Sequence, residues 1–282
     1  MKHEVTNYFA NMAQVHIYNH LTNQLINQST NQPINHICRK GRTMKVNLKI
    51  KRFNPESDEK PYFQEYTVEA NPNDRLLDAL MNIKRFQDGT LGFRKSCAHG
   101  VCGSDAMRIN GKNGLACKTL IKDVVTRDGD TIAIEPLQYF PVQRDLIVDQ
   151  TEFFKKYRAI KPYLINDELP KEKERIQSQE ERMVFDDTTN CILCTSCYSA
   201  CPIPENHPAF LGPAAIAQAY RFLADTRDRG FEERLPILDH PDGVWPCRNH
   251  FKCTQSCPRS ILITKRINQT KKMIEKHRQK AQ

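Results

Sequence analysis

Two cysteine boxes lie in the second half of the chain, CILCTSCYSACP from Cys191 to Pro202 and CRNHFKCTQSCP from Cys247 to Pro258. They share one frame of positions, except that His250 stands in the second box where Cys194 stands in the first. Thiolates match iron in softness and offset its charge, so cysteines at this spacing indicate iron–sulfur clusters. One box is therefore complete, and the other lacks one thiolate.

The spacing of the boxes also predicts which cysteines share a cluster. In bacterial ferredoxins with this spacing, the first three cysteines of a box hold one cluster and the fourth holds the other. A 4Fe–4S cluster would then be held by Cys191, Cys194, Cys197 and Cys257. The other cluster would receive only three thiolates, from Cys201, Cys247 and Cys253. Because a cubane corner without a thiolate readily lacks its iron, we expect a 3Fe–4S cluster there. Two alternatives stay open, namely a fourth iron held by His250 and a structural zinc site.

A third group lies in the first half of the chain, where Cys97, Cys102 and Cys117 accompany Asp105. The intervals match the plant-type 2Fe–2S spacing, with the carboxylate of Asp105 in the place of one cysteine. Two glycines, Gly100 and Gly103, suit a tight loop that turns backbone amides toward sulfide. A carboxylate is a harder ligand that can be protonated, so it would make the cluster potential sensitive to pH. The alternative is that Asp105 is a loop residue and the cluster lacks a ligand.

The composition supports reduced cysteines that serve as metal ligands. The three groups use ten of the eleven cysteines, and only Cys38 remains outside them. Secreted domains with a disulfide framework are usually far shorter than 282 residues. The net charge of +9 gathers near the chain ends without aromatic platforms, which argues against nucleic-acid binding. Mean hydropathy is −0.64, and no apolar run approaches the ~18 residues of a membrane helix.

The chain divides into three segments. Residues 1–43 are rich in Asn and Gln, so we expect either disorder or an over-extended gene start with Met44 as the natural first residue. Residues 44–143 alternate strand patterns with one helix and turn-rich loops, which predicts a small α+β domain around the third cysteine group. Its helix should be capped by Asn73 or Asp74, and turns are expected at Asn110–Gly111 and Asn113–Gly114.

Residues 144–282 should form a mainly helical domain that carries both cysteine boxes. Apolar residues at helical spacing predict a helix within 144–160 and another that starts at Pro213. Residues 171–182 are highly charged and should be solvated. Near the C-terminus, Ile263, Ile267 and Ile274 line one side of a basic helix. The basic side could face water or anionic lipid.

Four segments together resemble the iron–sulfur subunits of succinate dehydrogenase and fumarate reductase: SCAHGVCGSDAMRINGKNGLAC, CILCTSCYSACP, FLGPAAIAQAYRFLADTRD and CTQSCP. The resemblance spans about Met44 to the C-terminal helix. It implies an α+β chain, with an N-terminal 2Fe–2S ferredoxin domain of β-grasp fold and an all-α ferredoxin-like domain with 4Fe–4S and 3Fe–4S clusters. The family uses either Asp or Cys at the position of Asp105, which supports ligation by this carboxylate.

The resemblance further implies a wire for electrons. A flavoprotein subunit with covalent FAD would oxidise succinate to fumarate, and electrons would pass through the three clusters to quinone. Membrane anchor subunits, which can hold haem b, would keep this chain peripheral on the cytoplasmic face of a bacterial or archaeal membrane. The chain itself would have no substrate site. Fumarate reductase transfers electrons along the same path in the opposite direction. The alternative from another class of protein is a free multi-cluster ferredoxin, which carries electrons without belonging to a fixed complex.

The resemblance weakens around the expected quinone site. Many family members have a Trp pair shortly after the cysteine matching Cys201, and a His directly after the one matching Cys247. This chain has PIPENHP and Arg248 at those places. An altered quinone site would be lined by Pro202, Asn206, His207, Trp245, Arg248 and His250. Each of these residues could equally be a packing or loop residue.

Overall fold

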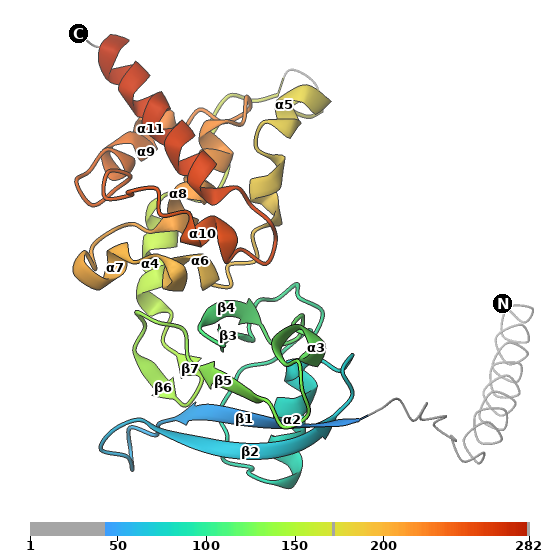
Figure 1. Cartoon of the computed structure of the whole chain (residues 1–282). Coiled ribbons are helices and arrows are strands. Elements are labelled where there is room, and N and C mark those ends of the chain that lie inside the picture. Colours follow the sequence, from blue (N-terminus) through green and yellow to red (C-terminus); the bar gives the residue numbers. More distant parts are fainter. Residues whose placement is uncertain (1–42, 171–172, 281–282) are drawn as a thin grey trace, which may run out of the picture. The chain divides into compact units, whose positions relative to one another are not determined.

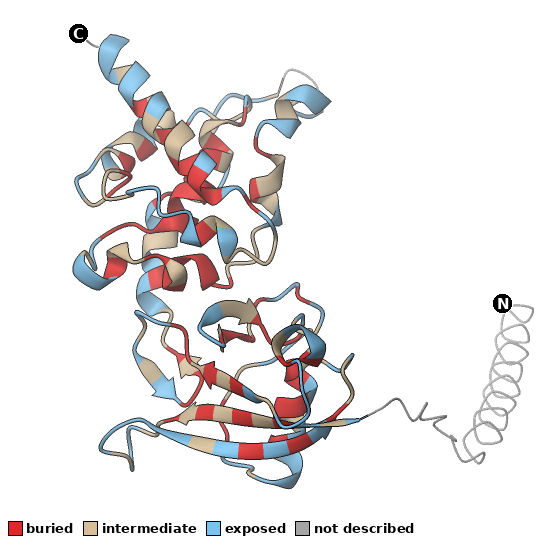
Figure 2. Cartoon of the chain, in the orientation of Figure 1, coloured by how far each residue is buried: buried red, intermediate tan, exposed pale blue. Residues whose placement is uncertain are grey.

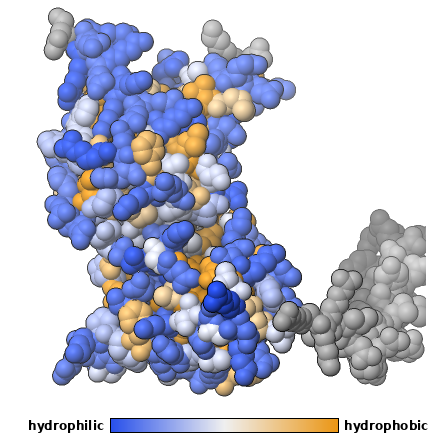
Figure 3. All heavy atoms as spheres, viewed as in Figure 1, coloured by the Kyte–Doolittle hydropathy of each residue, from blue (hydrophilic) through white to orange (hydrophobic). Residues whose placement is uncertain are grey.

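The computed structural model describes residues 43–170 and 173–280 (Figure 1). The expected disorder or alternative start of residues 1–43 therefore falls, apart from Thr43, outside the described residues, and so does Cys38. Two apolar cores organise the described chain: one under a β-sheet, mainly between residues 46 and 148, and one among helices from Phe153 to Ile274. Most side chains at the surface are polar, and Figure 3 shows a mainly hydrophilic face with scattered hydrophobic groups. Within the described residues, no helix is long and apolar enough to span a membrane.

A five-stranded sheet of order β2-β1-β5-β3-β4 forms the first core. Its strands are β1 (Met44–Arg52), β2 (Tyr62–Ala70), β3 (Ala106–Ile109), β4 (Lys112–Leu115) and β5 (Thr131–Glu135). β1 runs antiparallel to β2 and parallel to β5, whereas β3 is antiparallel to both of its neighbours. Val46, Leu48 and Ile50 are fully buried, as the alternation in β1 predicts. Helix α2 (Leu76–Phe86) adds five buried apolar residues to this core, and α3 (Ile121–Val124) is a single short turn.

The predicted cap of α2 is wrong. Arg75 occupies the N-cap position, and the carboxylate of Asp78 accepts a hydrogen bond from its backbone N–H at 3.2 Å. Asp74 instead accepts a bond from the N–H of Asn71 at 2.8 Å, which closes the turn before the helix. A nearby backbone donor thus competes successfully for the short carboxylate.

One of the two predicted asparagine–glycine turns is confirmed. Asn110 and Gly111 join β3 to β4 with φ angles of 46° and 79°, the left-handed pair typical of a tight hairpin. The other prediction is wrong, because Asn113 and Gly114 lie inside β4 and pair with Arg108 and Met107. Strand pairing therefore overrides the turn preference of that dipeptide.

Nine short segments build the helical half (Figure 2). They are α4 (Thr151–Ala159), α5 (Gln179–Met183), the 3-10 turn η1 (Asp186–Asn190), α6 (Ser196–Ala200), α7 (Ile203–Asn206), α8 (Pro213–Leu223), α9 (Phe231–Leu238), α10 (Lys252–Gln255) and α11 (Ile263–Lys280). The predicted start of α8 at Pro213 is confirmed. Ile263, Ile267 and Ile274 of α11 are buried as predicted, and α11 packs against α8. The first cysteine box lies between η1 and α7, and the second lies between α9 and α11.

The helix expected within 144–160 begins only at Thr151. Residues Val142–Arg144 and Ile147–Val148 form a small hairpin, β6–β7, and Asp145 lies in its turn with a φ of 49°. The buried carboxylate of Asp145 accepts hydrogen bonds from Arg52 Nε at 2.9 Å and from the N–H of Gly92 at 2.7 Å. These bonds hold the segment in the first core and prevent an earlier helix.

The same cation, Arg52, makes the sheet sensitive to acid. Asp88 pairs with Arg52 at 2.6 Å; burial tends to raise the pKa of Asp88, but hydrogen bonds from Thr90, Tyr66 and Arg52 hold it well below its ordinary value. A carboxyl whose folded-state pKa is depressed stabilises the fold above its unfolded-state value, about 3.9, and loses that contribution as the pH falls. We therefore expect the free energy of unfolding to drop between pH 5 and lower values. Asp88→Asn should lower the free energy of unfolding at neutral pH and make it fall less as the pH is lowered. Denaturant midpoints of the cluster-loaded chain at several pH values measure both effects. Equal acid limbs in both proteins would contradict this assignment.

Candidate iron–sulfur centres

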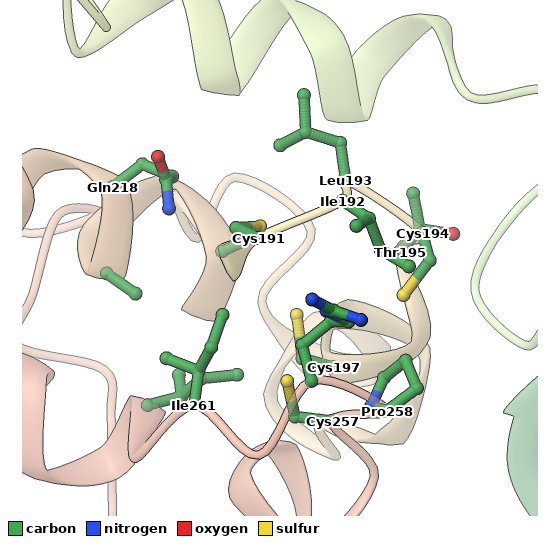
Figure 4. Close-up of a pocket in the computed structure, with 14 residues that line it drawn as sticks. Cys191, Ile192, Leu193, Cys194, Thr195, Cys197, Gln218, Cys257, Pro258 and Ile261 are labelled. Atoms are coloured by element: carbon green, nitrogen blue, oxygen red, sulfur yellow. The ribbon is translucent and has the colours of Figure 1, made fainter. Parts of the chain in front are cut away.

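Four cysteines from both boxes line one small cavity. Figure 4 shows the side chains of Cys191, Cys194, Cys197 and Cys257 around the same space. Cys191 and Cys194 lie on the loop before α6, Cys197 lies in α6, and Cys257 follows α10. The remaining walls are mostly apolar and include Ile261 and Ile263. The structure thus brings together the residues that the sequence predicted as the 4Fe–4S ligands.

The other three cysteines line a second small cavity. Cys201, Cys247 and Cys253 contribute sulfur atoms there, and His250 lies in the same wall. Cys201 comes from the first box and the other residues from the second, so each cavity combines both boxes. The hydroxyl of Thr264 lies 3.4 Å from the Cys253 sulfur.

The loop around His250 has the same left-handed backbone pattern as the loop around Cys194. In the first box, Leu193 and Thr195 flank Cys194 with φ angles of 52° and 65°. In the second box, the residues flanking His250 repeat this pattern, with 59° at Asn249 and 60° at Phe251. Left-handed conformations cost roughly 1–2 kcal/mol at non-glycine residues, so their recurrence indicates a shared constraint. His250 therefore occupies a backbone position shaped like that of a ligand.

Burial controls the protonation of these thiols. It raises the pKa of Cys191 to about 11, with further contributions from Cys194 and Cys257. It also raises the pKa of Cys201 to about 11, where the added repulsion comes from Cys253 and Cys247. In both cases, the cysteines that raise the pKa line the same cavity as the thiol they act on. Without metal, the thiols would be protonated at neutral pH, so cluster binding must release protons.

The third cysteine group forms a loop with backbone donors directed at sulfur. The N–H groups of His99 and Cys102 each lie 3.3 Å from the Cys97 sulfur. These bonds, together with one from Val101, lower the pKa of Cys97 to about 6. Gly100 and Gly103 have φ angles of 71° and 68°, which only glycine adopts without strain. The predicted tight loop is therefore present.

Asp105 meets Cys117 at the buried end of this loop. Asp105 is only 2% exposed, and one carboxylate oxygen accepts a hydrogen bond from the backbone N–H of Cys117 at 2.5 Å. The other oxygen, Oδ1, is buried and has no hydrogen-bond partner among the described residues. Burial and the adjacent carboxylate raise the pKa of the Cys117 thiol to about 12. Leaving a buried carboxylate oxygen unpaired costs free energy, and coordination of that oxygen to a metal ion would offset the cost.

The donor sets fit clusters better than single ions. Among the described residues, no three His, Cys, Asp or Glu side chains are arranged to hold one metal ion. A cluster spreads its ligands around several iron and sulfide atoms, so its thiolates need not converge on one point. The two thiol-lined cavities and the Asp105 loop have that open arrangement.

The loop of the third group touches the first box directly. A Cβ atom added to Gly103 would lie 2.6 Å from Cys194 Cβ and 3.0 Å from its Cα. Hydrogen bonds support this contact on either side, from Asn113 Nδ2 to the Ser196 carbonyl at 2.9 Å and from the Gln138 N–H to Ser199 Oγ at 2.8 Å. Two candidate centres are therefore separated only by the backbone of these loops.

An open pocket adjoins the second cavity and collects the six predicted quinone-site residues: Pro202, Asn206, His207, Trp245, Arg248 and His250. The pocket and the cavity share Pro202, Arg248 and His250 in their walls. The indole N–H of Trp245 donates to Asp239 at 2.9 Å, and the cations of Lys271 and Arg278 lie 5.9 and 5.1 Å from the ring. The ring is thus a fixed apolar wall of the pocket.

Sequence reasoning missed several partners of these residues. Ser104 and Ser196 place hydroxyls 3.2 and 3.5 Å from the sulfurs of Cys102 and Cys194, and their position two residues after each cysteine was a visible signal. Thr264, by contrast, approaches Cys253 from another helix, so no local pattern indicates it. Nor does any local pattern connect His207 with Asp242, whose side chains meet at 2.7 Å.

Comparisons with known proteins identify both halves. Residues 47–155 match the 2Fe–2S iron–sulfur cluster binding domain, and residues 183–258 match the 4Fe–4S dicluster domain. The succinate dehydrogenase iron–sulfur subunit of Coxiella burnetii is 44% identical over 225 residues, which are 79% of this chain and 94% of that protein. The fumarate reductase iron–sulfur subunit of Mycobacterium tuberculosis is 41% identical over 219 residues, 77% of this chain and 87% of that protein. A chain of the solved Mycobacterium smegmatis Sdh1 complex in the apo form matches with a TM-score of 0.75 and 26% identity, covering 83% of this chain and 97% of that one.

These similarities confirm the predicted order of a 2Fe–2S domain followed by a 4Fe–4S domain. Sheet and helix are both present, as an α+β chain requires. Identity of this level over almost the whole length of a relative establishes common descent. The chain belongs to the family of iron–sulfur subunits of succinate dehydrogenase and fumarate reductase, and it transfers electrons through iron–sulfur clusters as part of an oxidoreductase complex.

Proposed function

We propose that this chain conducts electrons from a FAD-containing flavoprotein subunit, which oxidises succinate to fumarate, to a quinone. The observation that carries the proposal is the division of seven cysteines between two adjoining cavities, one beside the Gly103 loop and one beside an open pocket. In this proposal electrons enter beside the Gly103 loop and leave beside the open pocket.

The ligand sets follow from that division. Cys97, Cys102, Asp105 and Cys117 would hold a 2Fe–2S cluster, and Cys191, Cys194, Cys197 and Cys257 a 4Fe–4S cluster. Cys201, Cys247 and Cys253 would hold a 3Fe–4S cluster. We assign residues 44–143 to a β-grasp ferredoxin domain and residues 144–282 to an all-α ferredoxin-like domain. The mixed sheet with one covering helix and the exchanged cysteine boxes support these assignments.

Residues around each proposed cluster have distinct roles in electron transfer. When bound, the clusters supply one-electron carriers. Backbone N–H groups around Cys97 stabilise negative charge on sulfur, which raises the tendency to accept an electron. Apolar walls at Ile261 and Ile263 keep water from the first cavity. The Trp245 ring and the neighbouring prolines offer a flat apolar slot in which a quinone ring could lie beside the second cavity.

Asp105 offers a direct test of the first ligand set. Asp105→Asn keeps the shape but removes the charge, so we expect at least the roughly 10- to 100-fold loss of cluster affinity known for removal of outer-sphere partners. Asp105→Cys should retain the cluster because it restores a fourth thiolate. Iron content and the visible absorption of the purified variants measure both effects. Full cluster occupancy in Asp105→Asn would show that the carboxylate is not a required ligand.

The family suggests the partners and location. We propose that membrane anchor subunits, with or without haem b, hold the chain as a peripheral subunit on the cytoplasmic face of the membrane. A free multi-cluster ferredoxin would instead purify as a single chain. Co-purification of a tagged chain with a flavoprotein and a hydrophobic subunit supports the complex, whereas a monomer without partners contradicts it.

We propose succinate oxidation as the direction of electron flow, with fumarate reduction, the same transfer in reverse, as the alternative; the relatives include subunits of both enzymes. Comparing succinate-driven quinone reduction with quinol-driven fumarate reduction by the purified complex tests the direction.

Low-temperature EPR of the purified complex tests the cluster types. The oxidised protein should show a 3Fe–4S signal, and dithionite should produce signals of a reduced 2Fe–2S and a reduced 4Fe–4S cluster. Total iron should be about nine atoms per chain, the sum of these three cluster types. Absence of the oxidised signal together with about ten iron atoms would assign His250 as a ligand of a second 4Fe–4S cluster.

A further inference from the structure

The open pocket contains an imidazole held by a carboxylate. His207 lies at the C-terminal end of α7, and its Nε2 is 2.7 Å from Asp242 Oδ1. The backbone carbonyl of Asp242 accepts a hydrogen bond from the Leu211 N–H at 2.8 Å, which fixes the carboxylate relative to α8. The other carboxylate oxygen, Oδ2, lies 3.4 Å from Nδ1 of His240. The same His240 Nδ1 accepts a hydrogen bond from the Asp242 backbone N–H at 3.2 Å, and of the two imidazoles only His207 lines the pocket.

Quinone reduction needs protons, which the chain of iron–sulfur clusters does not supply. A quinone takes up two electrons and two protons to become a quinol. The electrons come from succinate through the partner flavoprotein and the clusters. The protons must reach the quinone oxygens from acids in the pocket or from water, and positioned acids typically accelerate such steps about 10²- to 10⁴-fold.

We propose that His207 is the acid that protonates the quinone in this pocket, and that Asp242 is its positioning residue. This inference rests on the proposed quinone site. An imidazolium gives one proton to a quinone oxygen as the ring receives electrons, and water in the open pocket gives the second proton and recharges His207. Asp242 fixes the ring orientation through Nε2 and stabilises the positive charge before transfer. In the reverse direction, the neutral imidazole accepts a proton from quinol.

The other polar groups of the pocket are less suited to this task. The guanidinium of Arg248 remains protonated at any physiological pH. The indole N–H of Trp245 is already used by Asp239. Asn206 carries a neutral amide, and His250 stands at the ligand position of the second cavity. His207 is the remaining pocket side chain that can both donate and accept a proton.

Several charged groups set the field around this imidazole. His240 shares Asp242, and Lys156 acts on Asp242 through space from α4. Glu205 precedes His207 on α7, and Arg248 and His250 face the pocket from the second box. Of these groups, Asp242 alone is hydrogen-bonded to the imidazole of His207.

The test uses the purified complex, with succinate as reductant and a short-chain quinone as acceptor. His207→Gln should lower kcat for quinone reduction by roughly 10²- to 10⁴-fold with little change in KM, and abolish the alkaline fall of the rate. Asp242→Asn should keep KM and shift the alkaline limb to lower pH, because the imidazolium loses its counter-charge. His240→Gln, the matched control outside the pocket, should leave kcat within about 3-fold, since it lacks access to quinone. The oxidised-state EPR signal should be unchanged in all three variants.

Trp245→Ala separates this inference from the proposed site. If it raises the KM for quinone while His207→Gln leaves kcat and the pH profile unchanged, the pocket binds quinone but His207 is not the acid. If Trp245→Ala leaves the KM unchanged, the quinone pocket itself is wrong, and the inference falls with it. Loss of kcat in His240→Gln equal to that in His207→Gln would also overturn the assignment, because it would indicate a general electrostatic effect.

Discussion

Gly103→Ala should impair both stability and electron flow between the first two clusters. The added Cβ would lie 2.6 Å from Cys194 Cβ and 3.0 Å from Cys194 Cα, so the neighbour that must move is part of the backbone of a proposed ligand. The φ of 68° adds left-handed strain. Overpacking typically costs about 1–3 kcal/mol beyond that strain. Because the loops must separate, we expect slower oxidation of the 2Fe–2S cluster by the next one, measured by rapid freezing and EPR after mixing the complex with succinate.

Gly129→Ala is the matched control. Gly129 has a φ of 83°, but a Cβ there would meet nothing within 4 Å. It should therefore cost only the left-handed strain, roughly 1–2 kcal/mol, and leave electron transfer unchanged. If the two variants lose equal stability and both transfer electrons at the normal rate, the contact between Gly103 and Cys194 has no role in electron transfer.

His250→Cys should change the type of the last cluster. The loop already has the flanking left-handed residues found around Cys194, so a thiol at this position should complete a four-thiolate set. We expect the oxidised-state 3Fe–4S signal to vanish and total iron to rise from about nine to about ten atoms per chain. The extra negative ligand favours the oxidised cluster, so its reduction potential should fall and quinone reduction should slow.

His250→Ser is the control for that substitution, because serine fills the position with a small polar group and adds no thiolate. Its oxidised-state signal should match that of the unaltered chain. If His250→Ser instead loses one iron from a chain that holds about ten, the imidazole is a ligand, and the expected 3Fe–4S cluster is wrong.

The sequence indicates the cysteine groups well because ligand spacing within a box is local. The rule of exchanged fourth cysteines predicts the same two groups that line the cavities. Strand alternation in β1 and the start of α8 at Pro213 are local for the same reason. The spacing within each box, the alternation and the helix start depend on residues a few positions apart, whereas the exchange between the boxes follows from the ferredoxin rule.

Failures arise where a distant partner decides the outcome. The helical pattern before Thr151 yields to hydrogen bonds between Asp145 and the first core, and Asn113–Gly114 yields to pairing with β3. The contact between Gly103 and Cys194, and the pair of His207 with Asp242, join residues far apart in the sequence. Neither contact leaves a periodic or spacing signal in a single sequence.

The sharing of both boxes between the two cavities bears on how the protein is made. Each cavity needs cysteines from residues 191–201 and from residues 247–257, so neither donor set exists until the second box has left the ribosome. Closing that long loop carries an entropic cost before any thiolate gains its partners. Maturation of the helical half should therefore be all-or-none and late in synthesis. The Asp105 loop draws its donors from residues 97–117 alone, so the N-terminal half can acquire its cluster while the rest of the chain is still being translated.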